Sequence, residues 1–292
     1  MAAERGEPGE WDRAGRIAAA ARELGAKRIG PGVRRCELAD EIEEYIRGEG
    51  AEPAFPTNLS RNVEAAHFTP PPDDPAVFEI GDLVKIDVGA QIHGAIADTA
   101  ITVEVGGGRR HETFLRAVRE GVEAGIARVK AGVAVDSIGS SVEAAIHARG
   151  LKPVVNLTGH SIERYLLHAG KSIPNVSGMS HDRLQEGEVI AIEPFATNGA
   201  GEIANGAFGN IVRFRGEPTG ATAEVRAIFE KYRTLPFTAR WLTPAERKTL
   251  GTARRFLQVY PVFVERDGGL VSQAEHTVRV LADGAEVLTR AT

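Results

Sequence analysis

The sequence predicts an α+β fold built from two related halves around an antiparallel sheet. Residues 83–105 have the composition of two paired strands, a unit of helices, loop and strand occurs twice, and a helical segment interrupts the second unit. The chain has 292 residues, which is long enough for one large domain, and we expect a single domain spanning residues 1–292.

Residues 83–105 (LVKIDVGAQIHGAIADTAITVEV) predict a β-hairpin. Val, Ile and Thr dominate both arms, and Gly94 marks the connecting turn at 91–94. Asp87 lies in the middle of the first arm and Asp98 in the middle of the second, each beside apolar residues. Because an ionised carboxylate is costly in such surroundings, the pair indicates either a cation site or two side chains that cap turns or bond backbone N–H groups.

Amphipathic helices are predicted on both sides of this hairpin. They span residues 11–25, 34–47, 111–130 and 135–149. Gly25 is expected to end the first helix. Residues 51–78 contain several prolines and are expected to be mostly irregular.

The repeated unit indicates a duplication. Residues 32–58 match residues 132–158 in glycine, proline and apolar positions, at a constant offset of 100 residues. A second match, at an offset of 106, aligns Asp87 with Glu193 at the same point of a strand. A duplicated half-domain predicts pseudo-twofold symmetry with a site where the halves meet.

A helical insertion is predicted at about residues 215–262. Its helices are expected at residues 221–234 and 243–257. The second of these begins with a capping box, Thr243-Pro244-Ala245-Glu246. The strand at 188–196 should pair with a strand at 270–281, so the insertion separates two strands that lie side by side.

Four acidic residues and one histidine lie in strongly apolar surroundings. They are Asp87, Asp98, His160, Glu193 and Glu275. Four carboxylates at one interface cannot all ionise without cations. This donor set suits two divalent ions of intermediate hardness, such as Mn, Fe, Co or Zn. Taken singly, however, His160 could be a capping or core histidine, Glu193 a residue at a strand end, and Glu275 a solvent-facing residue.

Composition narrows the class of protein. The formal net charge of −5 argues against a broad nucleic-acid surface, so DNA is not an expected partner. No apolar run approaches about 18 residues, so no membrane span is expected, and the charged segment 1–15 lacks the apolar core of a secretory signal. Cys36, the single cysteine, excludes an internal disulfide and is expected to be a small buried side chain in a reducing compartment. We therefore expect a cytoplasmic protein.

Several short motifs are highly specific. They are FPTN at 55–58, AAHFTP at 65–70, KID at 85–87, GHSI at 159–162, HAGK at 168–171, AIEPF at 191–195, TLPF at 234–237, RWL at 240–242 and QAEHT at 273–277. In these motifs, in the Asp87–Asp98 spacing and in the helical insertion, the chain resembles the type II methionine aminopeptidases over nearly its whole length. The resemblance is to their short archaeal form and implies the pita-bread fold.

The resemblance implies a dinuclear metallohydrolase that removes the initiator methionine from nascent proteins and peptides and prefers a small second residue. It implies that Asp87 binds one metal ion, that His160 and Glu193 bind the other, and that Asp98 and Glu275 bridge both. A bridging water or hydroxide would attack the scissile carbonyl, with Glu193 as general base.

The resemblance also implies substrate contacts. His67 and His168 would hydrogen-bond the scissile amide and the developing oxyanion. The implied methionine pocket consists of Phe55, Leu167, Pro236 and Tyr260. Ala274 stands where the family usually has an aromatic residue, and strand alternation predicts that it points away from the metal ions. Pocket residues within 203–216 stay unassigned. A monomer with a transient ribosome contact is expected.

Two other functions stay open. A proline-specific aminopeptidase or prolidase of the same fold has the same five ligands but usually carries a sizeable N-terminal domain, whereas only 66 residues precede His67 here. A non-catalytic binding homologue would have lost ligands, whereas all five are present.

Overall fold

The structure, a computed structural model, describes residues 9–291. Residues 1–8 and 292, and with them much of the segment for which no secretory signal is expected, lie outside the described part. The first half contains α1 (Glu10–Arg28), α2 (Arg35–Gly48), β1 (Glu52–Pro53), β2 (Asn58–Arg61), β3 (Glu64–Ala66), β4 (Leu83–Ile92) and β5 (Ala95–Glu104). The second half contains α3 (Glu112–Ile126), α4 (Val135–His147), β6 (Lys152–Pro153), β7 (Thr158–Ile162), β8 (Ser172–Pro174), β9 (Val189–Ile192) and β10 (Phe195–Thr197). The remaining helices and strands are β11 (Ile203–Phe214), α5 (Ala223–Tyr232), β12 (Phe237–Thr238), α6 (Pro244–Thr252), β13 (Leu257–Glu265), β14 (Val271–Gln273), β15 (Glu275–Leu281) and β16 (Gly284–Val287).

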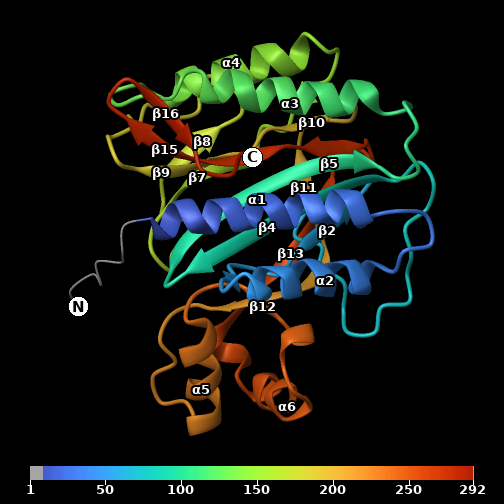
Figure 1. The fold of residues 1–292 in the computed structure, drawn as a ribbon, viewed down its shortest axis with the longest axis vertical. Helices are drawn as coiled ribbons and strands as arrows, with labels where there is room; N and C mark the ends of the chain where they lie inside the picture. Colours follow the sequence, from blue (N-terminus) through green and yellow to red (C-terminus); the bar gives the residue numbers. More distant parts are fainter. Residues whose placement is uncertain (1–8, 292) are drawn as a thin grey trace.

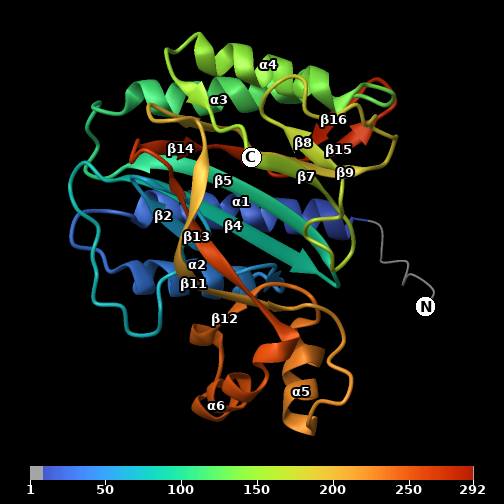
Figure 2. The same ribbon diagram turned by 180° about the vertical axis from the view of Figure 1, so that it is seen from behind.

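A nine-stranded antiparallel sheet forms the centre of the described chain. Its main path runs β1-β4-β5-β15-β9-β7-β8, with β2 paired to β4 and β16 paired to β15. Helices α1 to α4 cover one face of this sheet (Figure 1). Figure 2 shows β11 and β13 crossing the opposite face, and α5 and α6 at one end of the molecule. Within residues 9–291, no helix is both long and apolar enough to cross a membrane.

Equivalent backbone hydrogen bonds in the two halves agree with the predicted duplication. In the first half, the Gly32 N–H donates to the Phe78 carbonyl oxygen at 2.9 Å. In the second half, the Gly132 N–H donates to the Leu184 carbonyl oxygen at 2.8 Å. These partners have the offsets of 100 and 106 residues that the sequence alignment predicts. The two halves therefore fold in the same way, each with a helix pair packed on its own strands.

The prediction that Gly25 ends the first helix is wrong, because α1 continues to Arg28. A Cβ at position 25 would lie 2.7 Å from Ile42 Cδ1 and 3.1 Å from Ile86 Cγ2. The glycine therefore permits close packing of α1 on α2 and β4, and the helix tolerates its low propensity, which costs about 1 kcal/mol. Cys36 lies in α2 and is buried, as predicted.

Gly15 packs the same helix against the C-terminal segment. A Cβ on Gly15 would lie 2.2 Å from the Leu288 carbonyl oxygen, a backbone atom that cannot rotate away. We expect Gly15→Ala to lower the free energy of unfolding by about 1–3 kcal/mol in urea titrations, although alanine favours helix. Gly48→Ala, at the end of α2, is the control because its Cβ would meet nothing within 4 Å. An equal effect of both substitutions would contradict the prediction.

The predicted hairpin is present. β4 and β5 pair along their whole length, from Leu83 with Glu104 to Ile92 with Ala95. The turn is shorter than the predicted 91–94, because only two residues lie between the strands. They are His93 and Gly94, with φ values of 47° and 84°. Positive φ at both positions is the requirement of a two-residue type I′ turn.

Residues 51–78 are mostly irregular, as predicted, with the short strands β1, β2 and β3 among them. Two other assignments differ from the prediction. The strand predicted at 270–281 is broken at Ala274 into β14 and β15, and Glu193 lies between β9 and β10 rather than within a strand. β9 and β15 nevertheless pair, as predicted for the strands on either side of the insertion.

The insertion contains more strand than the sequence predicts. α5 and α6 are present, and Thr243 and Glu246 form the predicted capping box. A short 3₁₀ helix, Arg254–Phe256, follows α6, so the end of the predicted helical range 215–262 belongs to β13. β13 pairs with β11 in a ribbon with two register shifts. These irregularities explain why residues 203–216 show no regular alternation.

Candidate active site

Five consecutive strands of the main sheet position the five predicted metal ligands. They are Asp87 on β4, Asp98 on β5, Glu275 at the start of β15, Glu193 directly after β9 and His160 on β7. Because β4, β5, β15, β9 and β7 are neighbours in this order, segments that are far apart in the sequence meet at the centre of the sheet. The equivalence of Asp87 and Glu193 puts one carboxylate from each half into this group.

Close packing and side-chain hydrogen bonds hold these strands in register. A Cβ on Gly159 would lie 2.2 Å from the Ala191 carbonyl oxygen, so β7 can approach β9 this closely only with glycine before His160. On the other side, the Asp98 N–H donates to Thr277 Oγ1 at 2.7 Å, and Thr277 Oγ1 donates to the Asp98 carbonyl oxygen at 2.7 Å. Packing and hydrogen bonds of the chain itself therefore hold the ligand-bearing backbones in register.

The acidic side chains and His160 form one cluster. His160 Nε2 lies 3.7 Å from Asp98 Oδ2 and 3.7 Å from Glu193 Oε1. Ligand atoms of Asp98, His160 and Glu275 lie within 4.8 Å of one another. Gln273 Nε2 donates to Glu275 Oε2 at 3.3 Å and to Glu193 Oε2 at 3.5 Å. One amide therefore orients both glutamates.

Burial makes ionisation of the four carboxyl groups costly. It raises the pKa of Asp87 to about 7, and hydrogen bonds with Asp98 and Asn58 only partly oppose this shift. Burial, followed by the neighbouring carboxylates, raises the pKa of Asp98, Glu193 and Glu275 well above the usual values. For all four to be carboxylates at neutral pH, positive charge has to be present among them.

The donor atoms fit divalent metal ions. Asp87 Oδ1, Asp98 Oδ1 and Glu275 Oε1 are buried and accept no hydrogen bond from any residue in 9–291. Buried polar atoms rarely lack a partner, and such oxygens are suitable metal ligands. Burial lowers the pKa of His160 to about 3, so its imidazole is neutral. Its Nδ1 faces the Ser161 carbonyl oxygen at 3.4 Å, which leaves Nε2 directed at the cluster.

A cavity of about 210 Å³ adjoins the cluster. All eleven residues that the sequence predicts for the site line it. They are Phe55, His67, Asp87, Asp98, His160, Leu167, His168, Glu193, Pro236, Tyr260 and Glu275. The structure thus brings every predicted site residue together at one cavity with both apolar and acidic walls. Their individual roles stay predictions.

His67 and His168 lie close to the cluster. The His168 ring centroid is 4.4 Å from that of His160, and the His67 ring packs against Tyr260 and Phe263 at 5.1 and 4.4 Å. His67 has a φ of 65°, a left-handed value that is costly outside glycine and often found at functional sites. Burial lowers the pKa of both His67 and His168 to about 4, so each is neutral and has one N–H to donate.

Part of the cavity lining was not predicted. It consists of Asn58, Ala66, Asn156, Leu157, Thr158, Phe195, Ile211 and Phe263. Phe195 lies in the motif AIEPF at 191–195, two residues after Glu193, so the sequence could have indicated it as a lining residue. Ile211 lies in the irregular strand β11, and no sequence pattern indicated it. Gln273 could have been found, because it lies two residues before Glu275. Ala274 packs into the core of the second half and does not line the cavity, which agrees with the prediction that it points away from the metal ions.

Comparison with known proteins identifies the family. A model of metallopeptidase family M24 matches residues 10–233, and the chain therefore belongs to this family. Within it, the relatives include proteins named methionine aminopeptidase. The relative from Methanothermobacter thermautotrophicus is 43% identical over 95% of this chain and 97% of its own, and the one from Archaeoglobus fulgidus is 44% identical over 95% and 96%. The resemblance inferred from the motifs is confirmed.

Solved structures share the fold. A methionine aminopeptidase from Thermotoga maritima superposes with a TM-score of 0.72 over 98% of each chain, at 24% identity. A thermophilic Arx1 gives 0.82 at 16% identity, over 96% of this chain and 89% of its own. A prolidase from Pyrococcus furiosus gives 0.62 at 21% identity, over 97% of this chain but only 63% of its own. These similarities confirm the predicted pita-bread fold.

Proposed function

We propose that the protein is a metal-dependent aminopeptidase that removes the N-terminal methionine from peptides and nascent proteins. The observation that carries the proposal is the cluster of one imidazole and four carboxylates, of which Asp98 and Glu275 are buried and Asp87 and Glu193 partly buried, beside a partly apolar cavity. The 43% identity to a methionine aminopeptidase over 95% of the chain supports the choice of substrate. Action on nascent chains would take place in the cytoplasm, with a transient contact to the ribosome.

Two divalent ions, of Co, Mn, Fe or Zn, are the proposed cofactor. Asp87 would bind one ion, His160 and Glu193 the other, and Asp98 and Glu275 both. The position of Asp98 supports its bridging role, because its carboxyl group interacts with that of Asp87 and its Oδ2 lies 3.7 Å from His160 Nε2. When bound, the ions would activate a water molecule and polarise the scissile carbonyl group.

The protein's own groups would handle protons and orient the peptide. Glu193 is the proposed general base, because burial raises the pKa of its carboxyl group towards the range in which it can accept and return a proton. The neutral rings of His67 and His168 would donate hydrogen bonds to the scissile amide and to the developing oxyanion. Both rings lie at the wall of the same cavity as Glu193.

The methionine side chain would occupy the apolar part of the cavity. Its proposed walls are Phe55, Leu167, Pro236 and Tyr260. The cavity is small, about 210 Å³, and it also contains the acidic cluster, which supports a preference for a small second residue. The pairing of β9 with β15 across the insertion supports one catalytic domain that includes residues on both sides of it.

A peptide assay tests this function. We expect release of methionine from Met-Ala-Ser when Mn or Co is present, loss of this activity with a chelator, and no cleavage of an Ala-Pro peptide. Cleavage of Ala-Pro alone would instead indicate a proline-specific peptidase. A metal-loaded protein that is inert towards both peptides would indicate a non-catalytic binding homologue. Elemental analysis of protein purified without added metal would identify the ion.

A further inference from the structure

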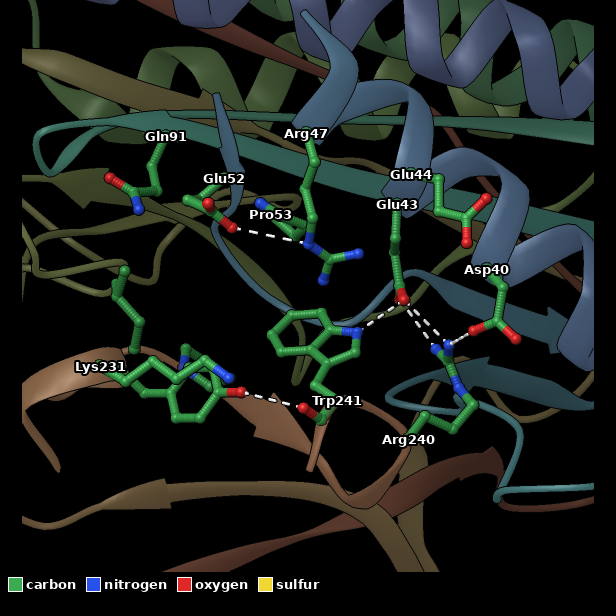
Figure 3. Close-up of a pocket in the computed structure, with 13 residues that line it drawn as sticks. Asp40, Glu43, Glu44, Arg47, Glu52, Pro53, Gln91, Lys231, Arg240 and Trp241 are labelled. Carbon is green, nitrogen blue, oxygen red and sulfur yellow. Dashed lines mark hydrogen bonds and ion pairs between the residues drawn. The ribbon is translucent and has the colours of Figure 1, made fainter. Parts of the chain in front are cut away.

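Glu43 of α2 is a buried carboxylate outside the metal cluster, with an exposed fraction of 1%. Figure 3 shows that it faces the side chains of Arg240 and Trp241. Arg240 donates from Nη1 and Nη2 to the two oxygens of Glu43 at 2.9 and 2.8 Å. Trp241 Nε1 donates to Glu43 Oε2 at 2.6 Å, and the Thr57 N–H donates to Glu43 Oε1 at 2.9 Å. The carboxylate therefore holds four donors at once.

These donors come from two segments that form walls of the proposed methionine pocket. Thr57 follows Phe55 by two residues, and Arg240 follows Pro236 by four. Phe55 and Pro236 both line the pocket, the first from the N-terminal half and the second from the insertion. Glu43 thus connects the insertion to the N-terminal half through the two segments that carry these pocket walls.

The contacts leave this connection little freedom. The Arg240 side chain is 3% exposed and also pairs with Asp40. Arg240 donates further to Thr69 Oγ1 at 3.1 Å, and Thr69 Oγ1 donates to the Thr57 carbonyl oxygen at 2.8 Å. The backbone of Thr57 is therefore held at both its N–H and its carbonyl group. A two-pronged pairing of guanidinium and carboxylate fixes relative orientation as well as distance.

A second cavity makes this connection important for the pocket. It has a volume of about 520 Å³, and Glu43, Arg47 and Trp241 line it (Figure 3). Pro236 is a further lining residue. Pro236 thus lies between the methionine pocket and another open space. Packing alone does not prevent this wall from shifting away from the substrate, because the space behind it is not filled by protein atoms.

We propose that Glu43 is a positioning residue that determines selectivity for methionine. Through Thr57 it sets the position of Phe55, and through Arg240 and Trp241 it sets the position of Pro236. The pocket then keeps the narrow shape that suits an unbranched side chain and rejects a branched one. This proposal rests on the proposed function and adds a residue that touches neither the metal ions nor the substrate.

The duplication supplies a matched control. Glu143 is the equivalent of Glu43 at the offset of 100 residues. It likewise holds a backbone N–H, that of Ser177, at 3.0 Å, and also accepts from Ser177 Oγ at 2.8 Å. Neither Glu143 nor Ser177 lines the methionine pocket. A change at Glu143 therefore removes the same kind of loop anchor without touching the proposed pocket walls.

The experiment compares Glu43→Gln with Glu143→Gln, both metal-loaded. The ratio of kcat/KM for Met-Ala-Ser to kcat/KM for Leu-Ala-Ser is measured, together with the metal content of each protein. In Glu43→Gln we expect this ratio to fall about tenfold, mainly through a higher KM for the methionine peptide, at unchanged metal content. Glu143→Gln should keep the wild-type ratio. A folded Glu43→Gln protein with the wild-type ratio, or an equal fall in both variants, would overturn the proposal.

A milder variant covers the case in which Glu43→Gln does not fold. Trp241→Phe removes one of the four donors and keeps an aromatic ring, so the ratio should fall in the same direction, and an unchanged ratio would again overturn the proposal. The activity of the wild-type protein on Met-Ala-Ser distinguishes a failure of this proposal from a failure of the proposed function. If it releases no methionine from Met-Ala-Ser, the proposed function fails. If it does, and the variants keep its ratio, only the role of Glu43 fails.

Discussion

His160→Ala is expected to lower kcat/KM for methionine release on the order of a thousandfold, or about 4 kcal/mol of transition-state stabilisation. His160 supplies the nitrogen donor of the proposed ligand set, and its Nε2 lies 3.7 Å from carboxylate oxygens of Asp98 and Glu193. Alanine leaves these carboxylates without that neutral partner and leaves one ion without a ligand. Steady-state kinetics on Met-Ala-Ser measures the loss, and elemental analysis should show fewer ions per chain.

His111→Ala is the control for the loss of a buried histidine. His111 is 5% exposed, close to the 7% of His160, and its Nε2 contacts the Gly81 carbonyl oxygen at 3.0 Å, away from the cavity. The control variant should lose stability but keep kcat/KM. Wild-type turnover and metal content in His160→Ala would contradict the proposed ligand set.

The residues of the site could be predicted because local rules and the duplication agree. A carboxylate between Val and Ile residues stands out in a strand pattern, and the alignment of Asp87 with Glu193 links the two halves. The pairing of adjacent strands β4, β5, β15, β9 and β7 in one sheet then brings the five ligands together. The sequence motifs indicated the family and the residues of the methionine pocket. Sequence could therefore predict which side chains meet.

The parts that could not be predicted depend on long-range packing. Gly25 has the sequence signal of a helix end, but it lies inside α1, at a point where the helix packs too closely on Ile42 and Ile86 to admit a Cβ. The ribbon of β11 and β13 has register shifts, so no simple alternation marks it. The pairing of Glu43 with Arg240 joins residues 197 positions apart. No periodic pattern in the sequence indicates such a contact, because it forms only when the insertion is folded.

Metal binding is expected to stabilise the fold as well as the reaction. The cluster contains buried carboxylate oxygens that accept no hydrogen bond from residues 9–291, and its acidic groups repel one another. An ion at about a thousand times its Kd would raise the free energy of unfolding by about 4 kcal/mol. Glu275→Gln removes one buried charge and keeps the shape, so the metal-free variant should be at least as stable as the metal-free wild type. Its gain on addition of Mn should be clearly smaller. Urea unfolding with chelator and with Mn measures both quantities.

Glu286→Gln separates this effect from the loss of an ordinary acidic group. Glu286 lies on β16, pairs with Arg279 at the surface and is 46% exposed. Its change should leave the metal-free stability and the gain with Mn close to those of the wild type, because exposed ion pairs contribute little. Glu275→Gln is expected to be at least as stable as the wild type without metal and to gain less stability when Mn is added. This combination arises only if that carboxylate is paired with a cation in the working protein. An equal gain with Mn in Glu275→Gln and in the wild type would show that the ion binds elsewhere.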